Sequence, residues 1–195
     1  MDEPAKVSIT EFVSSAGSPG DRQGHIDIRV NWDAPAGHDI FTCMFMLTQN
    51  GQGRSDRDIV WYNNCLSGDH SIEWQGQDYT DAEEWLSYKE VFSAALSRIS
   101  PDIQRLVIAL TFHAGTPLGV NLNQISNASV SLVDRLSGQE IESNELIDRL
   151  SLSEPTIVCG EIFRRGGGWA FRRLWQSIPG GIAALASSYG IADPA

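Results

Sequence analysis

The stretch HIDIRVNW, residues 25–32, decides the fold class of this chain. Its apolar positions alternate strictly with polar ones, and a period of two places the two sets of side chains on opposite faces of a β-strand. The apolar set is Ile26, Ile28, Val30 and Trp32. We therefore expect a strand with one face on a hydrophobic core and the other face in solvent.

Other segments show the same strand character. β-Branched and aromatic residues between turn residues predict strands over residues 40–48, 58–64, 71–74, 103–113, 128–134, 139–143, 155–164 and 168–176. Gly166, Gly167 and Gly168 supply a hairpin turn between the last two. About nine short strands separated by turns predict an all-β fold, a β-sandwich of two packed sheets.

Helical periodicity occurs at two places. Phe92, Leu96 and Ile99 predict a short helix before Pro101. A C-terminal helix is predicted over residues 179–190, packed on the sandwich by an apolar stripe. The stripe consists of Ile182, Leu185, Ala186 and Tyr189.

Composition limits the class of protein. The 195 residues suit a single domain, 1–195, in which residues 1–24 form a variable N-terminal strand and loop. With 14 basic and 25 acidic residues the formal charge is −11, which disfavours nucleic acid and favours divalent cations or basic protein surfaces. The N-terminus has no signal peptide and no apolar run reaches about 18 residues. We therefore expect a cytoplasmic protein without a transmembrane segment.

The cysteines and histidines show no pattern of a metal or catalytic centre. The three cysteines form no CxxC pair, and each lies in an apolar stretch, so we expect buried reduced thiols. The sequence has neither a His-Glu-x-x-His motif nor a Gly-x-Ser-x-Gly elbow. No residue is therefore predicted to be catalytic.

Arginines cluster in RRGGGWAFRR, residues 164–173. The predicted hairpin carries Arg164, Arg165, Arg172 and Arg173. Such a basic spot on an acidic chain predicts a contact for an anionic partner, a phosphate or a lipid head group at a membrane surface. The alternative is that these arginines pair with the protein's own carboxylates. Because side chains alternate along a strand, Arg172 and Arg173 face opposite ways.

Four stretches, in order, resemble the TerD family of bacterial proteins, which is linked to tellurium resistance and general stress. They are RVNWD (29–33), DIVWYNN (58–64), NQISNASVSLVD (123–134) and GEIFRRGGGWAFRRLWQSIPGGIAALASSYGI (160–191). The resemblance covers most of the chain from about residue 25. It implies a TerD-like β-sandwich, in agreement with the strand pattern.

The resemblance also implies calcium binding through two acidic motifs, from which this sequence departs. The first motif, Asp-Leu-Asp, reads DIF here, so that Asp39 matches and Phe41 replaces the second aspartate. The second corresponds to GQDYTDAEEW (76–85), which retains Gly76, Thr80 and Glu84 but lacks a glycine-containing insert.

Two interpretations of this acidic stretch remain open. The first is one weakened calcium site, since calcium takes six to eight oxygen ligands. Its predicted ligands are Asp39, the carbonyl of Gln77, Asp78, Glu83 and Glu84. The second is a solvated acidic loop on an acidic protein.

Three functional hypotheses follow. The leading one is a non-enzymatic, stress-associated domain that binds other proteins of a stress-response system and holds at most one weak divalent cation. The second is a metal-independent protein-interaction module of the same fold. The third is a metal-assisted hydrolase with Asp78 and Glu84 as acid and base.

Overall fold

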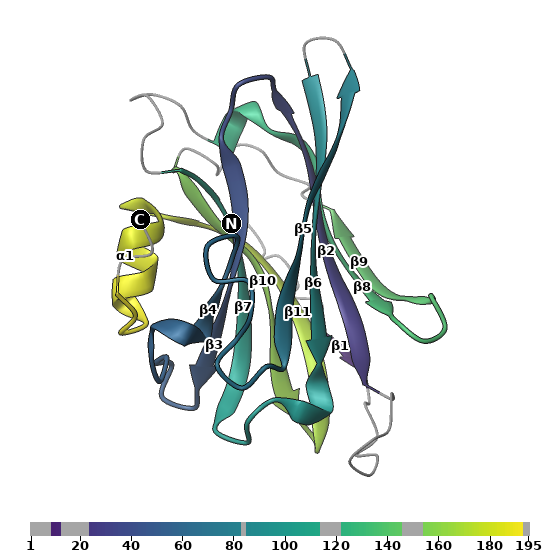
Figure 1. Ribbon diagram of the computed structural model, residues 1–195, viewed down its shortest axis with the longest axis vertical. Coiled ribbons are helices and arrows are strands. Elements are labelled where there is room, and N and C mark those ends of the chain that lie inside the picture. The colour runs from purple at the N-terminus through teal and green to yellow at the C-terminus, as the bar shows by residue number, and fades with distance from the viewer. Residues whose placement is uncertain (1–8, 13–23, 83–84, 114–121, 146–153, 193–195) are drawn as a thin grey trace, which may run out of the picture.

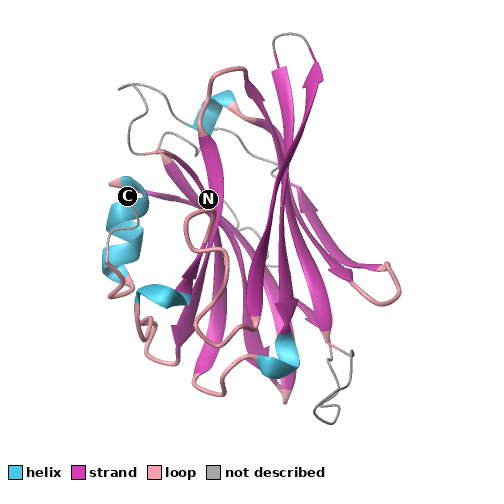
Figure 2. Ribbon diagram, in the orientation of Figure 1, coloured by secondary structure: helices cyan, strands magenta, loops and turns pink. Residues whose placement is uncertain are grey.

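Two antiparallel sheets packed face to face make up most of the chain, and one helix covers the outer side of one of them (Figure 1). This computed structural model describes residues 9–12, 24–82, 85–113, 122–145 and 154–192. Strands dominate the described residues, with a single α-helix near the C-terminus (Figure 2). The predicted all-β sandwich with a short C-terminal helix is confirmed.

The two sheets differ in size. Sheet A has the spatial order β1 (Ile9–Phe12), β11 (Gly168–Ile178), β10 (Thr156–Arg165), β7 (Ile103–Phe112), β3 (Ile40–Thr48) and β4 (Ile59–Val60). Sheet B has the order β5 (Ile72–Ala82), β6 (Trp85–Ala95), β2 (His25–Pro35), β8 (Ser126–Asp134) and β9 (Glu140–Glu145). The helices are η1 (Asp56–Asp58), η2 (Leu96–Arg98), η3 (Leu122–Gln124) and α1 (Gly181–Ser188).

The main core lies between the sheets. The four apolar residues predicted from HIDIRVNW are all buried, from Ile26 at 2% exposed to Ile28 at 0%. They belong to one apolar cluster that joins β2, β6 and β8 of sheet B to β3, β7, β10 and β11 of sheet A. The alternation in the sequence therefore identifies the inner face of β2 correctly.

A second core lies between the outer face of sheet A and α1. Ile182, Leu185 and Ala186 of the helix are buried in one cluster with Phe45 and Val107 of the sheet. The Tyr189 ring, just after the helix, meets the Phe45 ring at a centroid distance of 5.2 Å. The predicted apolar stripe of this helix is thus confirmed.

Three predictions from the sequence are wrong in whole or in part. The strand predicted over 58–64 is reduced to β4, because Asp58 belongs to η1 and Tyr62 and Asn63 form a turn. Residues 92–95 continue strand β6, and only η2 follows, because β6 is paired along its length with β2 and with β5. Pairing on both sides overrides the helical spacing of Phe92, Leu96 and Ile99. Cys65 is exposed, since it lies in the loop between β4 and β5, whereas Cys43 and Cys159 are buried as expected.

The hairpin turn between β10 and β11 is formed as the sequence predicts. Gly166 has φ 57° and Gly167 has φ 83°, a region that side chains disfavour. Gly168 already belongs to β11. Within the described ranges, no helix has the length and apolar character needed to cross a membrane.

Candidate functional site

The acidic stretch GQDYTDAEEW lies on a β-hairpin. Residues 76–82 belong to β5 and Trp85 begins β6, whereas Glu83 and Glu84 lie outside the described residues. Figure 1 shows this hairpin at the top of the view, and β6 is paired with β2 from its first residue, Trp85, which lies opposite Pro35. The described part of the predicted loop is therefore extended strand, which fixes the direction of its side chains.

The register of this hairpin separates the predicted ligands. Gln77 is paired with Glu90, and Asp78 with Lys89. Because the Gln77 side chain bonds to Glu90 between the sheets, alternation places Asp78 on the outer face of sheet B. Asp39, by contrast, directly precedes β3 of sheet A. The geometry therefore does not bring the carboxylates of Asp39 and Asp78 together.

The cation site stays a prediction. Within the described residues there is no group of three or more His, Cys, Asp or Glu side chains suited to hold a metal ion. Two of the five predicted ligands, Glu83 and Glu84, are outside those residues. The Gln77 side chain donates through Nε2 to the carbonyl of Ile40, 3.2 Å away, and so ties the hairpin to sheet A.

The side chain of Glu90 is 1% exposed and accepts hydrogen bonds from several neighbours in this region. Trp74 Nε1 donates to its Oε2 at 2.8 Å, and Gln77 Nε2 donates to its Oε1 at 2.9 Å. Thr42 of β3 donates through its backbone N–H, at 3.3 Å, and through its hydroxyl. Since Thr42 belongs to sheet A and Glu90 to sheet B, the carboxylate joins the two sheets by hydrogen bonds.

Burial and hydrogen bonding act on this carboxyl in opposite directions. Desolvation disfavours the charged form and raises the pKa of Glu90, while the donors from Thr42, Trp74 and Gln77 partly offset the rise. Motif analysis of the sequence missed Glu90. The signal that was available is the alternation in YKEVF, residues 88–92, which puts Glu90 on the same face as Tyr88 and Phe92.

Phe41, at the position where the calcium motif has its second aspartate, lies in an aromatic cluster. It is 5% exposed, and its ring is 5.6 Å from Trp61 and 5.2 Å from Tyr62, centroid to centroid. The His113 ring lies 6.1 Å from Phe41. An apolar side chain so enclosed offers no oxygen to a cation, and its neighbours occupy the surrounding space.

Asp39 is exposed and directly precedes β3 at this end of the sandwich. Burial raises the pKa of Tyr62, and the Asp39 carboxylate adds to the rise. Burial, Tyr79 and then Asp39 likewise raise the pKa of Tyr88 in sheet B. The same exposed carboxylate therefore contributes to the raised pKa of one tyrosine in the turn after β4 and of one in β6.

Arg164 and Arg172, two of the four predicted arginines, contact other residues of the fold. Arg164 donates to the carbonyls of Ile103 and Ile99, at 2.9 and 3.1 Å, and lies 4.4 Å above the Trp169 ring. Arg172 forms an ion pair with the buried Glu161. The other two, Arg165 and Arg173, are partly or fully exposed near the turn and along β11. The prediction of an anionic partner at this hairpin stays a prediction.

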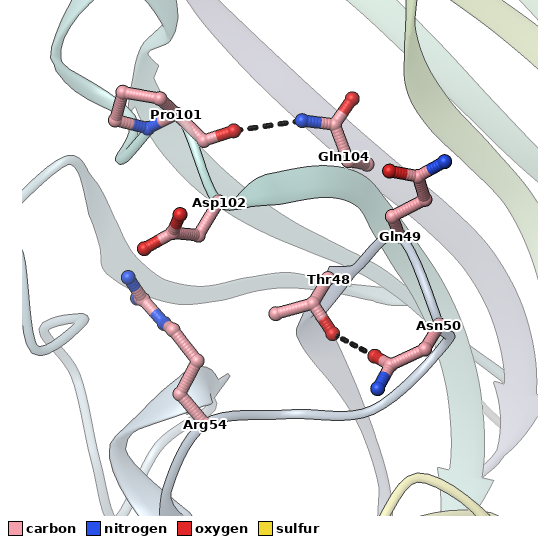
Figure 3. Close-up of a pocket in the computed structure, with 7 residues that line it drawn as sticks. All are labelled: Thr48, Gln49, Asn50, Arg54, Pro101, Asp102 and Gln104. Carbon is pink, nitrogen blue, oxygen red and sulfur yellow. Dashed lines mark hydrogen bonds between the residues drawn. The ribbon is translucent and has the colours of Figure 1, made fainter.

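A polar cleft of about 630 Å³ lies where β3 ends and β7 begins (Figure 3). It is lined by Thr48, Gln49, Asn50, Arg54, Pro101, Asp102 and Gln104. Its only cation, Arg54, donates from Nε and Nη2 to the buried Asp58 at 2.9 and 2.8 Å. Asp102 faces the same guanidinium across the cleft in Figure 3. The positive charge is already matched, so the cleft has no evident ligand chemistry.

The buried carboxylates do not form a catalytic pair. Asp58, Glu90 and Glu161 lie on η1, β6 and β10. Among the described residues each accepts from its own donors, for example Arg54 for Asp58, Trp74 for Glu90 and Arg172 for Glu161. Acid and base catalysis by two carboxylates needs both at one reacting centre, an arrangement that these three do not offer.

Comparison with known proteins identifies the family. The model of the TerD domain matches residues 18–189, so the chain belongs to the TerD family. It is 27% identical over 168 residues to tellurium resistance protein TerD of Serratia marcescens, covering 84% of this chain and 86% of that protein. It is 28% identical over 169 residues to general stress protein 16U of Bacillus subtilis, with the same coverage.

A third relative and a solved structure agree. Chemical-damaging agent resistance protein B of Clostridium acetobutylicum is 31% identical over 137 residues, 70% of this chain and 96% of that protein. The crystal structure of a homologue of telluride resistance protein from Streptomyces coelicolor superposes with a TM-score of 0.62 at 18% identity. It covers 87% of this chain and 98% of that one, and at this identity it supports the fold alone.

Proposed function

We propose that this chain is a non-enzymatic binding module of a bacterial stress response and acts by contact with other proteins. The names of its relatives refer to tellurium resistance, general stress and chemical damage, and they support a role in a stress response. One structural observation supports the binding role: an exposed aromatic side chain on the β5–β6 hairpin.

That side chain is Tyr79, which is 61% exposed. Its ring lies 6.2 Å from Tyr88, and the Tyr88 ring stacks on the buried Trp32 at 5.4 Å and 10°. A tyrosine whose ring rests at an angle of 42° against a neighbouring ring presents apolar area and a hydroxyl while losing little conformational freedom on binding. Tyrosines of this kind are enriched at protein interfaces.

The charge near the hairpin indicates the kind of partner. Burial, Tyr79 and then the exposed Asp39, just before β3, raise the pKa of Tyr88. Asp78 lies exposed on the other face of the same hairpin, and the whole chain carries a formal charge of −11. A basic surface, whose guanidinium or ammonium groups also favour aromatic faces, is complementary to this combination.

The same geometry supports a minor role for any cation. N–H and O–H donors from Thr42, Trp74 and Gln77 already satisfy Glu90, so the tie between the sheets needs no metal. With Asp78 turned away from Asp39, fewer carboxylates can converge, and calcium affinity falls with the number of charged ligands. We therefore propose at most one weak calcium site, with no part in catalysis.

A capture experiment with matched variants tests the binding role. The immobilised wild type, Tyr79→Ala and Leu136→Ala are each incubated with lysate of the host. Leu136, 66% exposed on the turn after β8, is the control for loss of an exposed apolar side chain elsewhere. We expect a salt-sensitive partner that Leu136→Ala retains and Tyr79→Ala loses. Equal capture by all three proteins would contradict the role of the hairpin.

A further inference from the structure

A groove of about 480 Å³ lies between the outer face of sheet A and α1, and neither the binding hairpin nor the acidic stretch contributes to it. Its lining is divided about equally between apolar and polar side chains. The lining residues on which the argument rests are Arg105, Val107, Glu161, Arg172, Leu174 and Tyr189. Its volume is within the range of about 300–1,000 Å³ that is typical of small-molecule sites.

One side of the groove is charged. Glu161 of β10 is 3% exposed, and Arg172 of β11, its partner in the strand register, donates to it through Nη2. Arg105 of β7 approaches the same carboxylate, with Nη1 3.6 Å from Oε2. Two guanidinium groups thus meet one carboxylate. This local excess of one positive charge contrasts with the acidic character of the chain as a whole.

Arg172 also has an unused donor. Its Nε is buried and has no hydrogen-bond partner among the described residues. A buried donor without an acceptor is unfavourable, and native structures rarely keep one without a reason. Tyr189 lines the same groove, and burial raises the pKa of its phenol, so the hydroxyl remains a donor at neutral pH.

We propose that this groove binds a small organic monocarboxylate with an apolar chain. The ligand carboxylate accepts from Arg172 and Arg105 and balances the excess positive charge beside Glu161. Its chain lies along Val107, Leu174 and the apolar side of α1. The proposal is independent of the hairpin surface, because the groove is on the outer face of sheet A and the hairpin belongs to sheet B.

Octanoate is a suitable probe, and 1-octanol is its uncharged counterpart with the same chain length. Ala184 is exposed on α1 and lines the groove, so Ala184→Phe fills the opening without overpacking the core. Ser187 is exposed on the same helix and does not line the groove, which makes Ser187→Phe the matched control. Arg172→Lys keeps a charge beside Glu161 but removes the Nε donor.

Calorimetric titration at neutral pH measures the binding. We expect saturable octanoate binding in the wild type and in Ser187→Phe. Ala184→Phe fills the opening, and Arg172→Lys removes a hydrogen-bond donor to a charged group. Each should therefore lower the affinity for octanoate by at least about tenfold. No saturation up to about 10 mM octanoate, which is well above the Kd of even a millimolar ligand, would overturn the proposal. Equal affinity for octanol would overturn carboxylate recognition. A peptide that binds the groove in place of octanoate would overturn the assignment to a small molecule.

Discussion

Replacing Glu90 with glutamine is expected to destabilise the protein, because the amide keeps only one of the two acceptor oxygens. In the wild type, Oε1 accepts from Gln77, while Oε2 accepts from Trp74 and from the Thr42 hydroxyl. The Thr42 hydroxyl and the Gln77 amide can reorient toward the new NH₂ group, but each reorientation leaves another donor or acceptor unsatisfied. At least one buried polar group therefore loses its partner.

The expected magnitude follows from that count. One unsatisfied buried group costs about 1–3 kcal/mol, so the free energy of unfolding should fall by about that amount. For a chain of 195 residues, this corresponds to a fall in Tm of about 2–4 °C per kcal/mol. Urea and thermal unfolding at pH 7 measure it. Glu73→Gln is the control, since Glu73 is exposed on β5. A Glu90→Gln variant as stable as Glu73→Gln would refute the reasoning.

Three further predictions follow from the same contacts. Burial raises the pKa of Glu90 above its unfolded value of about 4.3, so the proton-linked part of its stability is complete below that value and is lost as pH rises through the folded pKa, whereas the hydrogen bonds counted above remain; urea unfolding at several pH values should show the advantage of the wild type over Glu90→Gln becoming smaller in that window and the remainder persisting at pH 7. Truncation before Pro179 removes α1 and exposes the apolar surface beneath it, which should lower the free energy of unfolding by at least about 3 kcal/mol and reduce solubility; a soluble truncated chain of unchanged Tm would rule out docking of the helix. Arg172→Glu places a second carboxylate beside the buried Glu161, with Arg105 still next to it, and should cost about 1–3 kcal/mol, while Arg173→Glu should change the unfolding midpoint little.

Much of the fold could be predicted because the alternation of apolar and polar residues along a strand identifies which of its faces points into the core. HIDIRVNW gave β2, and the apolar run 40–48 gave β3 with its observed bounds. The C-terminal helix was predicted because its apolar spacing coincides with Pro and Gly at its start. Residues 92–95 were not, because Phe92, Leu96 and Ile99 fit a helical stripe by chance and only the pairing with β2 and β5 selects the strand.

The candidate site was less accessible to sequence analysis. An acidic run is compatible with a metal site or with a solvated turn. Which carboxylates face each other depends on the strand register, because a shift of one residue moves every side chain to the other face, and the register is set by the partner strand. Gln77 therefore turned inward to Glu90 while Asp78 turned outward, a division that the residues alone do not show. Likewise, Arg172 forms an ion pair with Glu161 across the β10–β11 hairpin. Because the segment contains four arginines, the sequence does not show which of them makes this pair.

The most direct test of this account is thermal unfolding in EDTA and in calcium, because the central claim is that hydrogen bonds at Glu90, and not a bound cation, tie the two sheets. We predict the same Tm in EDTA as in plain buffer. For a weak site with a Kd near 1 mM, 5 mM calcium should add about 1 kcal/mol, or about 2–4 °C, and the gain should vanish in Asp78→Ala combined with Glu84→Ala. A fall of more than about 5 °C in EDTA, equivalent to more than about 1 kcal/mol, would show that a cation holds the fold and would contradict the account.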